Sequence, residues 1–89
     1  MSITVIFPPN NMTTDMYEEA LRRLENAGAG APPGRQYHTC FGTSGHLGVV
    51  DVWDTHQNFE AFGEVLRPIM ADIGIESEPQ ISETYNIIG

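Results

Sequence analysis

Three side chains from the middle of the chain could carry out chemistry together: His38, Asp51 and Trp53. A carboxylate beside an imidazole fixes the tautomer of the ring and raises its basicity, which suits a general base. An indole next to that pair could stack on a planar ligand. These three residues are therefore the candidate catalytic group.

The grouping depends on a predicted β-hairpin. Two strand-like segments flank Ser44-Gly45, a small and flexible two-residue turn. With that turn, facing residues have numbers that sum to 89, so His38 lies opposite Asp51 and Gln36 lies opposite Trp53. A turn longer by one residue would flip every side chain to the other face and separate the pair.

The contact between His38 and Asp51 also has a purely structural interpretation, as a polar pair that satisfies its own hydrogen bonds. A cavity of ligand size in which His38 and Trp53 both expose atoms would favour the enzyme hypothesis. If side chains of the second helix fill that volume, the enzyme hypothesis loses its basis.

Four further residues are candidates for binding a substrate. Three of them recur along one face of the predicted second helix: Phe59, Phe62 and Leu66. The fourth, Tyr85, lies in the predicted last strand and could donate a hydrogen bond. We expect no metal, because the three histidines and the single cysteine, Cys40, do not have the spacing of a zinc site. We also expect no cofactor.

The elements that must position these residues form one predicted domain, residues 1–89, in the order strand, helix, strand, strand, helix, strand. The expected ranges are a strand over 2–7 that ends at Pro8-Pro9, a helix capped within 13–15 that ends at Gly28, a hairpin over 36–54, a helix capped by Asp54 or Thr55 that ends at Gly74, and a strand over 80–88. Right-handed crossovers give this order a ferredoxin-like α+β fold, an antiparallel sheet with two helices on one face.

The uncovered face of such a sheet predicts association. A domain of 89 residues has a marginal core, and one cysteine cannot form a disulfide within the chain. Both faces of the hairpin carry apolar residues, so we expect a homodimer that joins two sheets face to face. The expected interface residues are Tyr37, Phe41, Val50 and Val52. The alternative is a monomer whose hairpin alternates imperfectly.

The charge excludes two classes of partner. The formal net charge is −8, with four arginines and no lysine, so the chain has no basic stripe with which to bind nucleic acid. The same charge opposes docking to an anionic membrane, and no apolar run has the length of a membrane span. The N-terminus also lacks the basic region of a signal peptide. We therefore expect a soluble, cytoplasmic protein.

The segment from Val50 to Phe62 resembles the dimeric α+β barrel superfamily, and more narrowly the small proteins related to antibiotic-biosynthesis monooxygenases. An apolar strand is followed there by a tryptophan, an acidic residue, a threonine and a helix with phenylalanines at this spacing. The resemblance implies two sheets closed into a barrel and a ligand pocket between the sheet and helices of each protomer. Members include cofactor-free monooxygenases, haem-degrading enzymes, cyclases, isomerases and proteins without known activity.

The resemblance is incomplete at the residues that carry activity in that superfamily. Trp53 matches the tryptophan implicated in catalysis, but Val49 and Phe59 stand where the monooxygenase branch has an asparagine and an aromatic hydroxyl. No histidine follows His56, which argues against haem degradation. Two hypotheses follow: a cofactor-independent monooxygenase-, cyclase- or isomerase-like enzyme that acts on a small planar, apolar or aromatic metabolite, and a non-catalytic dimeric ligand-binding or accessory module.

Overall fold

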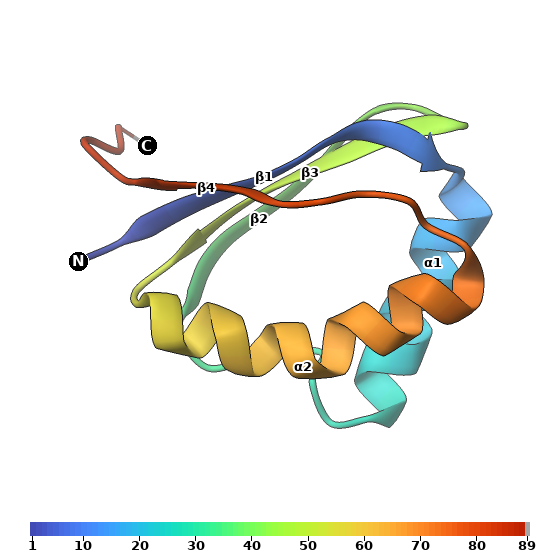
Figure 1. Ribbon diagram of the computed structural model, residues 1–89, viewed down its shortest axis with the longest axis horizontal. Helices are drawn as coiled ribbons and strands as arrows, with labels where there is room; N and C mark the ends of the chain where they lie inside the picture. The colour runs from blue at the N-terminus through green and yellow to red at the C-terminus, as the bar shows by residue number, and fades with distance from the viewer. Residues whose placement is uncertain (89) are drawn as a thin grey trace.

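The computed structural model describes residues 1–88 and confirms the predicted order of elements (Figure 1). These elements are β1 (Ile3–Met12), α1 (Thr14–Asn26), β2 (Arg35–Thr43), β3 (His46–Trp53), α2 (His56–Ile73) and β4 (Gln80–Glu83). Neither helix has the length and apolar composition needed to cross a membrane.

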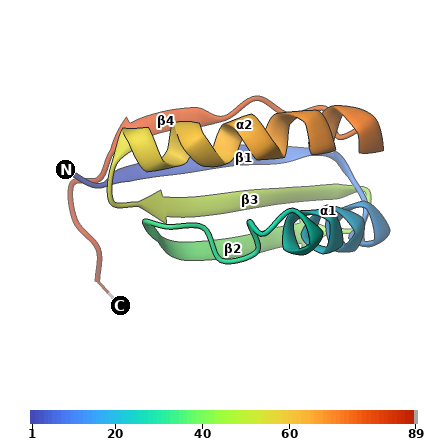
Figure 2. The same cartoon turned by 90° about the horizontal axis from the view of Figure 1, so that it is seen from below.

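The four strands form one antiparallel sheet in the order β2-β3-β1-β4. Both helices lie against the same face of this sheet, and within residues 1–88 no element covers the other face (Figures 1 and 2). This arrangement is the ferredoxin-like α+β fold that the sequence predicts. We call the two sides of the sheet the helix side and the open side.

The hydrophobic core lies between the sheet and the helices. Its strands contribute alternate residues, because successive side chains of a strand point to opposite faces. Val5 and Trp53 have no exposed surface at all. The buried core residues are Ile3, Val5, Phe7, Met12, Ala20, Leu24, Leu47, Val49, Trp53, Phe59, Phe62 and Ile75.

The hairpin register agrees with the prediction over most of its length. His38 lies opposite Asp51, and the pairs Thr39–Val50, Tyr37–Val52 and Phe41–Gly48 are also observed. Gly45 has a φ of 92°, a conformation that the tight turn requires and that glycine adopts without strain.

One predicted pair, Gln36 with Trp53, is wrong. A bulge in β2 shifts the register there, and Arg35 is the residue that lies opposite Trp53. A bulge adds one residue to its strand and so redirects the side chains beyond it. Gln36 is exposed and accepts a hydrogen bond from the Ser2 hydroxyl at 3.4 Å.

Two strand boundaries also differ from the prediction. β1 does not end at Phe7 but passes Pro8 and Pro9 through a register shift and ends at Met12. The Asn10 side chain donates hydrogen bonds there to the carbonyl oxygens of Pro8 and Leu47, both at 3.0 Å, and so bridges the two strands where the ladder is interrupted. β4 is shorter than predicted and ends at Glu83.

Each helix begins at a threonine cap within the predicted range. The hydroxyl oxygen of Thr13 accepts a hydrogen bond from the Met16 amide, and that of Thr55 accepts one from the Asn58 amide, both at 3.1 Å. These bonds satisfy amide groups that would otherwise have no partner in the first turn.

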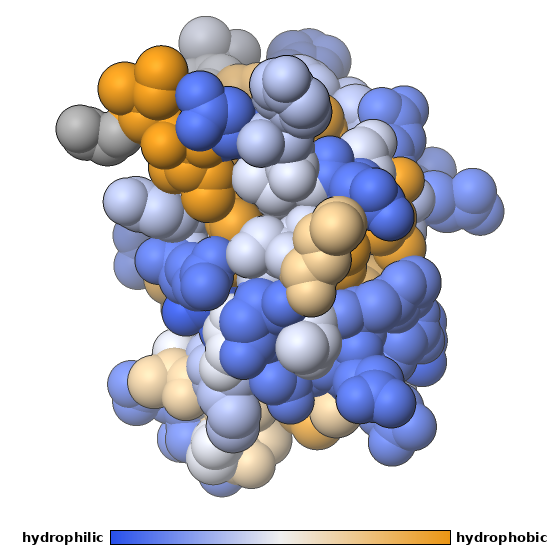
Figure 3. Space-filling view, turned by 90° about the vertical axis from the view of Figure 1, so that its left-hand side faces the viewer, coloured by the Kyte–Doolittle hydropathy of each residue, from blue (hydrophilic) through white to orange (hydrophobic). Residues whose placement is uncertain are grey.

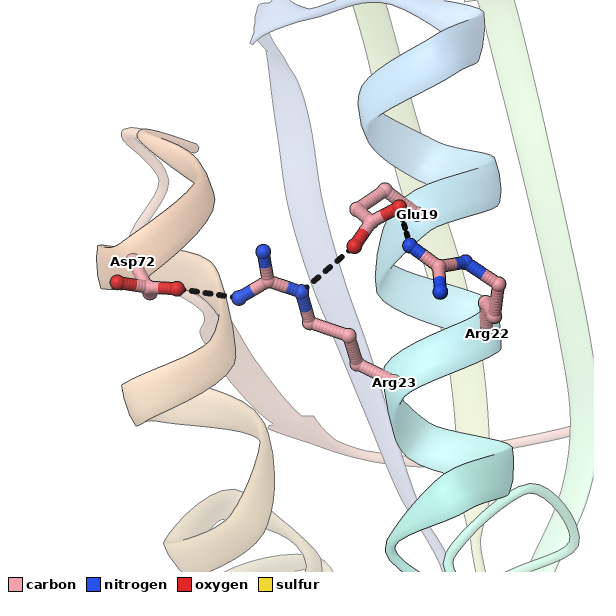
Figure 4. Close-up of polar contacts among 4 residues, drawn as sticks. All are labelled: Glu19, Arg22, Arg23 and Asp72. Atoms are coloured by element: carbon pink, nitrogen blue, oxygen red, sulfur yellow. Dashed lines mark hydrogen bonds and ion pairs between the residues drawn. The ribbon is translucent and has the colours of Figure 1, made fainter.

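Charged side chains connect the two helices on their outer surface (Figure 4). The Arg23 guanidinium lies between Glu19 of its own helix and Asp72 of α2, and Arg22 also pairs with Glu19. Hydrogen bonds from Arg22 and Arg23 lower the pKa of the Glu19 carboxyl. This network is exposed, so its contribution depends on ionic strength.

Candidate active site

A cleft opens between the helix side of the sheet and the two helices, and we call it the main cleft. Its enclosed volume is about 60 Å³, and about 550 Å³ is empty when its open mouth is counted. Almost all of the surface inside it is apolar. It is lined by Phe7, Asn10, Met12, Tyr17, Ala20, Leu21, Leu24, Arg35, His38, Val49, Asp51, Phe62, Leu66, Met70, Ile75 and Ser77.

His38 and Asp51 lie on the sheet wall of the main cleft, where the hairpin register places them. The distance between His38 Nδ1 and Asp51 Oδ1 is 2.6 Å. The Asp51 side chain is only 3% exposed and that of His38 is 24% exposed, so the imidazole lies between the buried carboxylate and the cleft. Asp51 is the one buried charged residue of the described chain.

Tyr17 extends this pair into a chain of three groups. Its hydroxyl oxygen lies 2.6 Å from His38 Nε2, and the two rings are nearly parallel, with an interplanar angle of 4°. An ionised carboxylate only accepts hydrogen bonds, so Nδ1 of a neutral His38 carries the proton and donates it to Asp51. Nε2 is then free to accept the Tyr17 O–H. The result is a continuous relay from Tyr17 through His38 to Asp51.

Burial raises the pKa of the Tyr17 hydroxyl above its ordinary value of 10.0, and the nearby Cys40 and Asp51 add to this effect. Tyr17 is therefore a neutral phenol near pH 7 that can donate a hydrogen bond to His38 Nε2. Tyr17 is not among the site residues predicted from the sequence. Its signal was a hydroxyl on the inward face of an amphipathic helix, which the periodicity alone classes with the apolar core.

Trp53 does not line the main cleft, in contrast to the prediction that a ligand would stack on it. Two rings of α2 cover the indole: the centroid of Phe59 lies 5.7 Å away in an edge-on arrangement, and that of Phe62 lies 5.1 Å away. The indole is fully buried, and its Nε1 has no hydrogen-bond partner within residues 1–88. In this arrangement Trp53 supports Phe62, which does line the cleft.

The candidate substrate-binding residues separate into three places. Phe62 and Leu66 line the main cleft, and Leu66 also lines the second cavity described next. Phe59 instead lines a second cavity of about 150 Å³, which lies between α2 and the segment before β4 and which we call the α2 cavity. Tyr85 is fully exposed and lines neither, because β4 ends before it.

The main cleft meets half of the condition set for the enzyme hypothesis. His38 borders the open volume and Trp53 does not. Phe62 and Leu66 form part of the wall and leave the cleft open. The aromatic rings that a ligand could contact in this cleft therefore include Phe62 and exclude Trp53, and the polar groups that it could contact include Tyr17, His38 and Arg35.

The other candidate ligating side chains lie apart. His46 is exposed on the hairpin. His56 lies in the first turn of α2, where its Nε2 is 2.9 Å from Oε1 of the exposed Glu60. Burial raises the pKa of the half-buried Cys40 thiol. Within residues 1–88 no three histidine, cysteine or acidic side chains are grouped as a metal site would require.

Comparison with solved structures places the fold in a known class. SnoaB, a cofactor-independent oxygenase from Streptomyces nogalater, superimposes with a TM-score of 0.69 at 16% identity, over 98% of this chain and 96% of that one. A proposed antibiotic biosynthesis monooxygenase from Chloroflexus aurantiacus J-10-fl gives a TM-score of 0.64 at 15% identity, over 100% and 98% of the two chains. A proposed antibiotic biosynthesis monooxygenase from Nitrosomonas europaea gives 0.61 at 17% identity, over 97% and 100%.

The chain thus has the α+β fold of antibiotic-biosynthesis monooxygenase-like proteins, as the resemblance of its sequence predicts. No protein-family model matches the sequence, and no curated protein matches it significantly. At these identities the likeness concerns the fold, and the chemistry must be argued from the cleft itself.

Proposed function

We propose that the main cleft is the active site of a cofactor-independent enzyme that moves a proton on a small, planar, largely apolar metabolite. The observation that carries this proposal is the relay Tyr17–His38–Asp51, which begins at the cleft surface and ends at a buried carboxylate. A general base of this kind needs a tautomer fixed by its neighbour and a path for the proton, and the relay has both.

In the proposed reaction the substrate loses a proton from an activated C–H or O–H group to the Tyr17 oxygen. The Tyr17 proton passes to His38 Nε2, and the imidazolium is stabilised by the Asp51 carboxylate. The electron pair of the broken bond remains on the substrate as an enolate or carbanion. Isomerisation, cyclisation and reaction with dioxygen all begin from such an anion, so the proposal extends to these three outcomes.

The dimensions of the main cleft limit the ligand. An engineered protein cavity of about 150 Å³ holds one benzene molecule, so the enclosed 60 Å³ cannot hold a whole aromatic ring. A ring would therefore lie partly in the open mouth. The wall of α2 runs from Phe62 to Met70, a separation of eight residue steps that rises about 12 Å along the helix. A planar compound of two or three fused rings fits that length.

Proton transfer can be tested without knowing the natural substrate. Cyclic 1,3-diketones serve as probes, and NMR follows the exchange of their activated C–H protons for deuterium. We expect the protein to accelerate this exchange, and we expect Tyr17→Phe and His38→Gln to remove the acceleration. His46→Gln is the matched control, since it changes an exposed histidine away from the cleft. Equal rates in all four proteins would contradict the proposal.

The open side of the sheet supports a homodimer as part of the same proposal. It carries exposed apolar side chains, among them Ile6, Tyr37 and Phe41, which would prefer a covering surface. Figure 3 shows further hydrophobic surface at the end of the molecule where both termini lie, and the exposed apolar residues near the C-terminus are Tyr85, Ile87 and Ile88.

Sedimentation velocity tests the dimer. Thr39 is exposed on the open side, so Thr39→Arg adds a charge there without disturbing the core of one protomer. We expect this variant to sediment as a monomer. Gln57→Arg adds the same charge to the exposed first turn of α2 and should leave the dimer intact. A wild-type protein that sediments as a monomer would refute the sheet-to-sheet pairing.

A non-catalytic dimeric module remains the second candidate, and the placement of Trp53 favours it. The tryptophan implicated in catalysis in the resembled family is buried here beneath two phenylalanines. If this function holds, the probes bind in the main cleft without accelerated exchange. For either function we propose that the protein is located in the cytoplasm.

A further inference from the structure

The bulge in β2 carries Arg35 to the helix side of the sheet. Regular alternation would place Gln36 there beside His38, whereas the register shift sets Arg35 opposite Trp53. Facing residues of antiparallel strands share a face, and the Arg35 side chain accordingly lines the main cleft. Bulges next to active sites commonly redirect one side chain in this way.

The position of the bulge is held by Gly34. This residue has a φ of 86°, and its carbonyl oxygen accepts a hydrogen bond of 2.8 Å from the Asp54 amide, just before α2. A Cβ at Gly34 would collide with the side chains of Asp54 and Asn58. The chain therefore approaches the start of α2 as closely as only glycine allows, and Arg35 follows directly.

The Arg35 guanidinium is placed on an aromatic surface and lacks an acidic partner in the described chain. Its Cζ lies 5.8 Å from the centroid of the Phe62 ring, within the range of a cation–π contact. Its one hydrogen bond there is a long contact of 3.5 Å to the Gly30 carbonyl oxygen. By contrast, Arg22 and Arg23 pair with carboxylates.

Arg67 also has no ion pair within residues 1–88, but it is exposed, whereas Arg35 is half-buried. A half-buried guanidinium presents five N–H donors in a planar fork that matches an oxyanion. The walls around it are otherwise mostly apolar, and the Asp51 carboxylate is buried behind His38, so the charge of Arg35 is the main attraction for an anionic ligand in the main cleft.

We propose that the main cleft selects planar ligands that carry an anionic oxygen, and that Arg35 binds this oxygen while Phe62 contacts the ring. The inference rests on the proposed function and names its substrate class. A carboxylate on the substrate would be held from the start, and the enolate formed by proton loss would be stabilised as its charge develops.

The test compares two ligands of the same shape, 2-naphthoate and 2-naphthamide, by NMR titration at low salt. We expect the wild-type protein to bind the anion about tenfold more tightly than the neutral amide. Arg35→Gln should remove this preference while it leaves amide binding unchanged. Arg67→Gln is the matched control, because Arg67 is exposed, has no ion pair within residues 1–88 and lines the α2 cavity instead.

Three outcomes would overturn the inference: equal binding of the two ligands to the wild-type protein, an equal loss of the preference in both arginine variants, or no binding at millimolar ligand. Fluorescence of the buried Trp53 verifies that each variant is folded. The failure of the inference is separable from that of the proposed function. Deuterium exchange without anion preference refutes only the role of Arg35, and anion preference without exchange refutes only the proton transfer.

Discussion

The contact between His38 and Asp51 can be measured as a coupling free energy. The atoms are 2.6 Å apart and the carboxylate is almost fully buried, so their hydrogen bond should contribute about 1.5–3 kcal/mol. His38→Ala strands a buried carboxylate and should lower the free energy of unfolding by about 3–5 kcal/mol. Asp51→Ala leaves a ring that water can partly reach and should cost about 1–3 kcal/mol. The double variant should lose about 1.5–3 kcal/mol less than the sum.

Urea unfolding followed by Trp53 fluorescence is the appropriate assay. The chain has a single tryptophan, which has no exposed surface in the folded protein, so its emission reports unfolding of the core directly. All variants must be compared at one protein concentration, because dimer formation would make the apparent stability depend on concentration.

An exposed pair of the same type provides the control. His56 and Glu60 lie 2.9 Å apart, but both side chains are more than half exposed, so their coupling should stay below about 0.5 kcal/mol. The reasoning about burial fails if the two pairs give similar coupling. It fails equally if the losses from His38→Ala and Asp51→Ala simply add, since additivity within about 0.5 kcal/mol means that the two groups do not interact.

Three further outcomes follow from groups outside this pair. The raised pKa of Tyr17 means that folding opposes ionisation of its hydroxyl. The wild type should therefore lose stability relative to Tyr17→Phe as the pH rises above about 10, whereas the stability difference between the two proteins should not change with pH near pH 8. The lowered pKa of Glu19 stabilises the fold above its ordinary value of 4.5, and urea unfolding of Arg23→Gln should show a smaller loss of stability on acidification and less sensitivity to salt. Thr55→Ala removes the cap that accepts the Asn58 amide and should lower the free energy of unfolding by about 1 kcal/mol.

A specific result would contradict each of these three predictions. A constant difference between wild type and Tyr17→Phe from pH 8 to pH 11 would show that the hydroxyl titrates alike in the folded and unfolded chains. An Arg23→Gln variant with an unchanged salt dependence would show that the network of Figure 4 does not connect the helices in solution. A Thr55→Ala variant as stable as the wild type would mean that water replaces the cap without loss.

The hairpin register could be predicted because it depends on local chemistry. Ser44-Gly45 supports a two-residue turn, and this turn fixes the pairs of the two strands as far as the bulge next to Arg35. The contact of His38 with Asp51 follows from that register alone. The helix periodicity likewise places Phe62 and Leu66 against the sheet, where both line the main cleft.

The rest of the site depends on contacts between elements that are distant in sequence. Periodicity assigns Tyr17 to the inward face of α1, but only the docking of α1 over β2 brings its hydroxyl to His38. The burial of Trp53 depends on how two rings of α2 pack on the sheet. The bulge at Arg35 depends on the approach of the preceding loop to α2, and neither strand encodes that approach.

The contact of His38 with Asp51 and the placement of Arg35 therefore depend on different parts of the chain. The contact of His38 with Asp51 rests on the register of β2 and β3, whereas the position of Arg35 rests on the close approach of Gly34 to the start of α2. A change at Gly34 should therefore alter which ligand binds and leave the relay intact. Gly34→Ala is the direct test, because its Cβ would displace the loop that leads into the bulge.

Gly45→Ala is the matched control for this substitution. Gly45 has a similar φ of 92°, but a Cβ there meets nothing within 4 Å, so the variant carries only backbone strain of about 1–2 kcal/mol. We expect Gly34→Ala to be destabilised by about 1–3 kcal/mol more, as overpacking requires, and to lose the preference for 2-naphthoate. Both variants should keep the coupling between His38 and Asp51. If Gly45→Ala loses the ligand preference equally, the preference depends on general stability and not on the bulge that places Arg35.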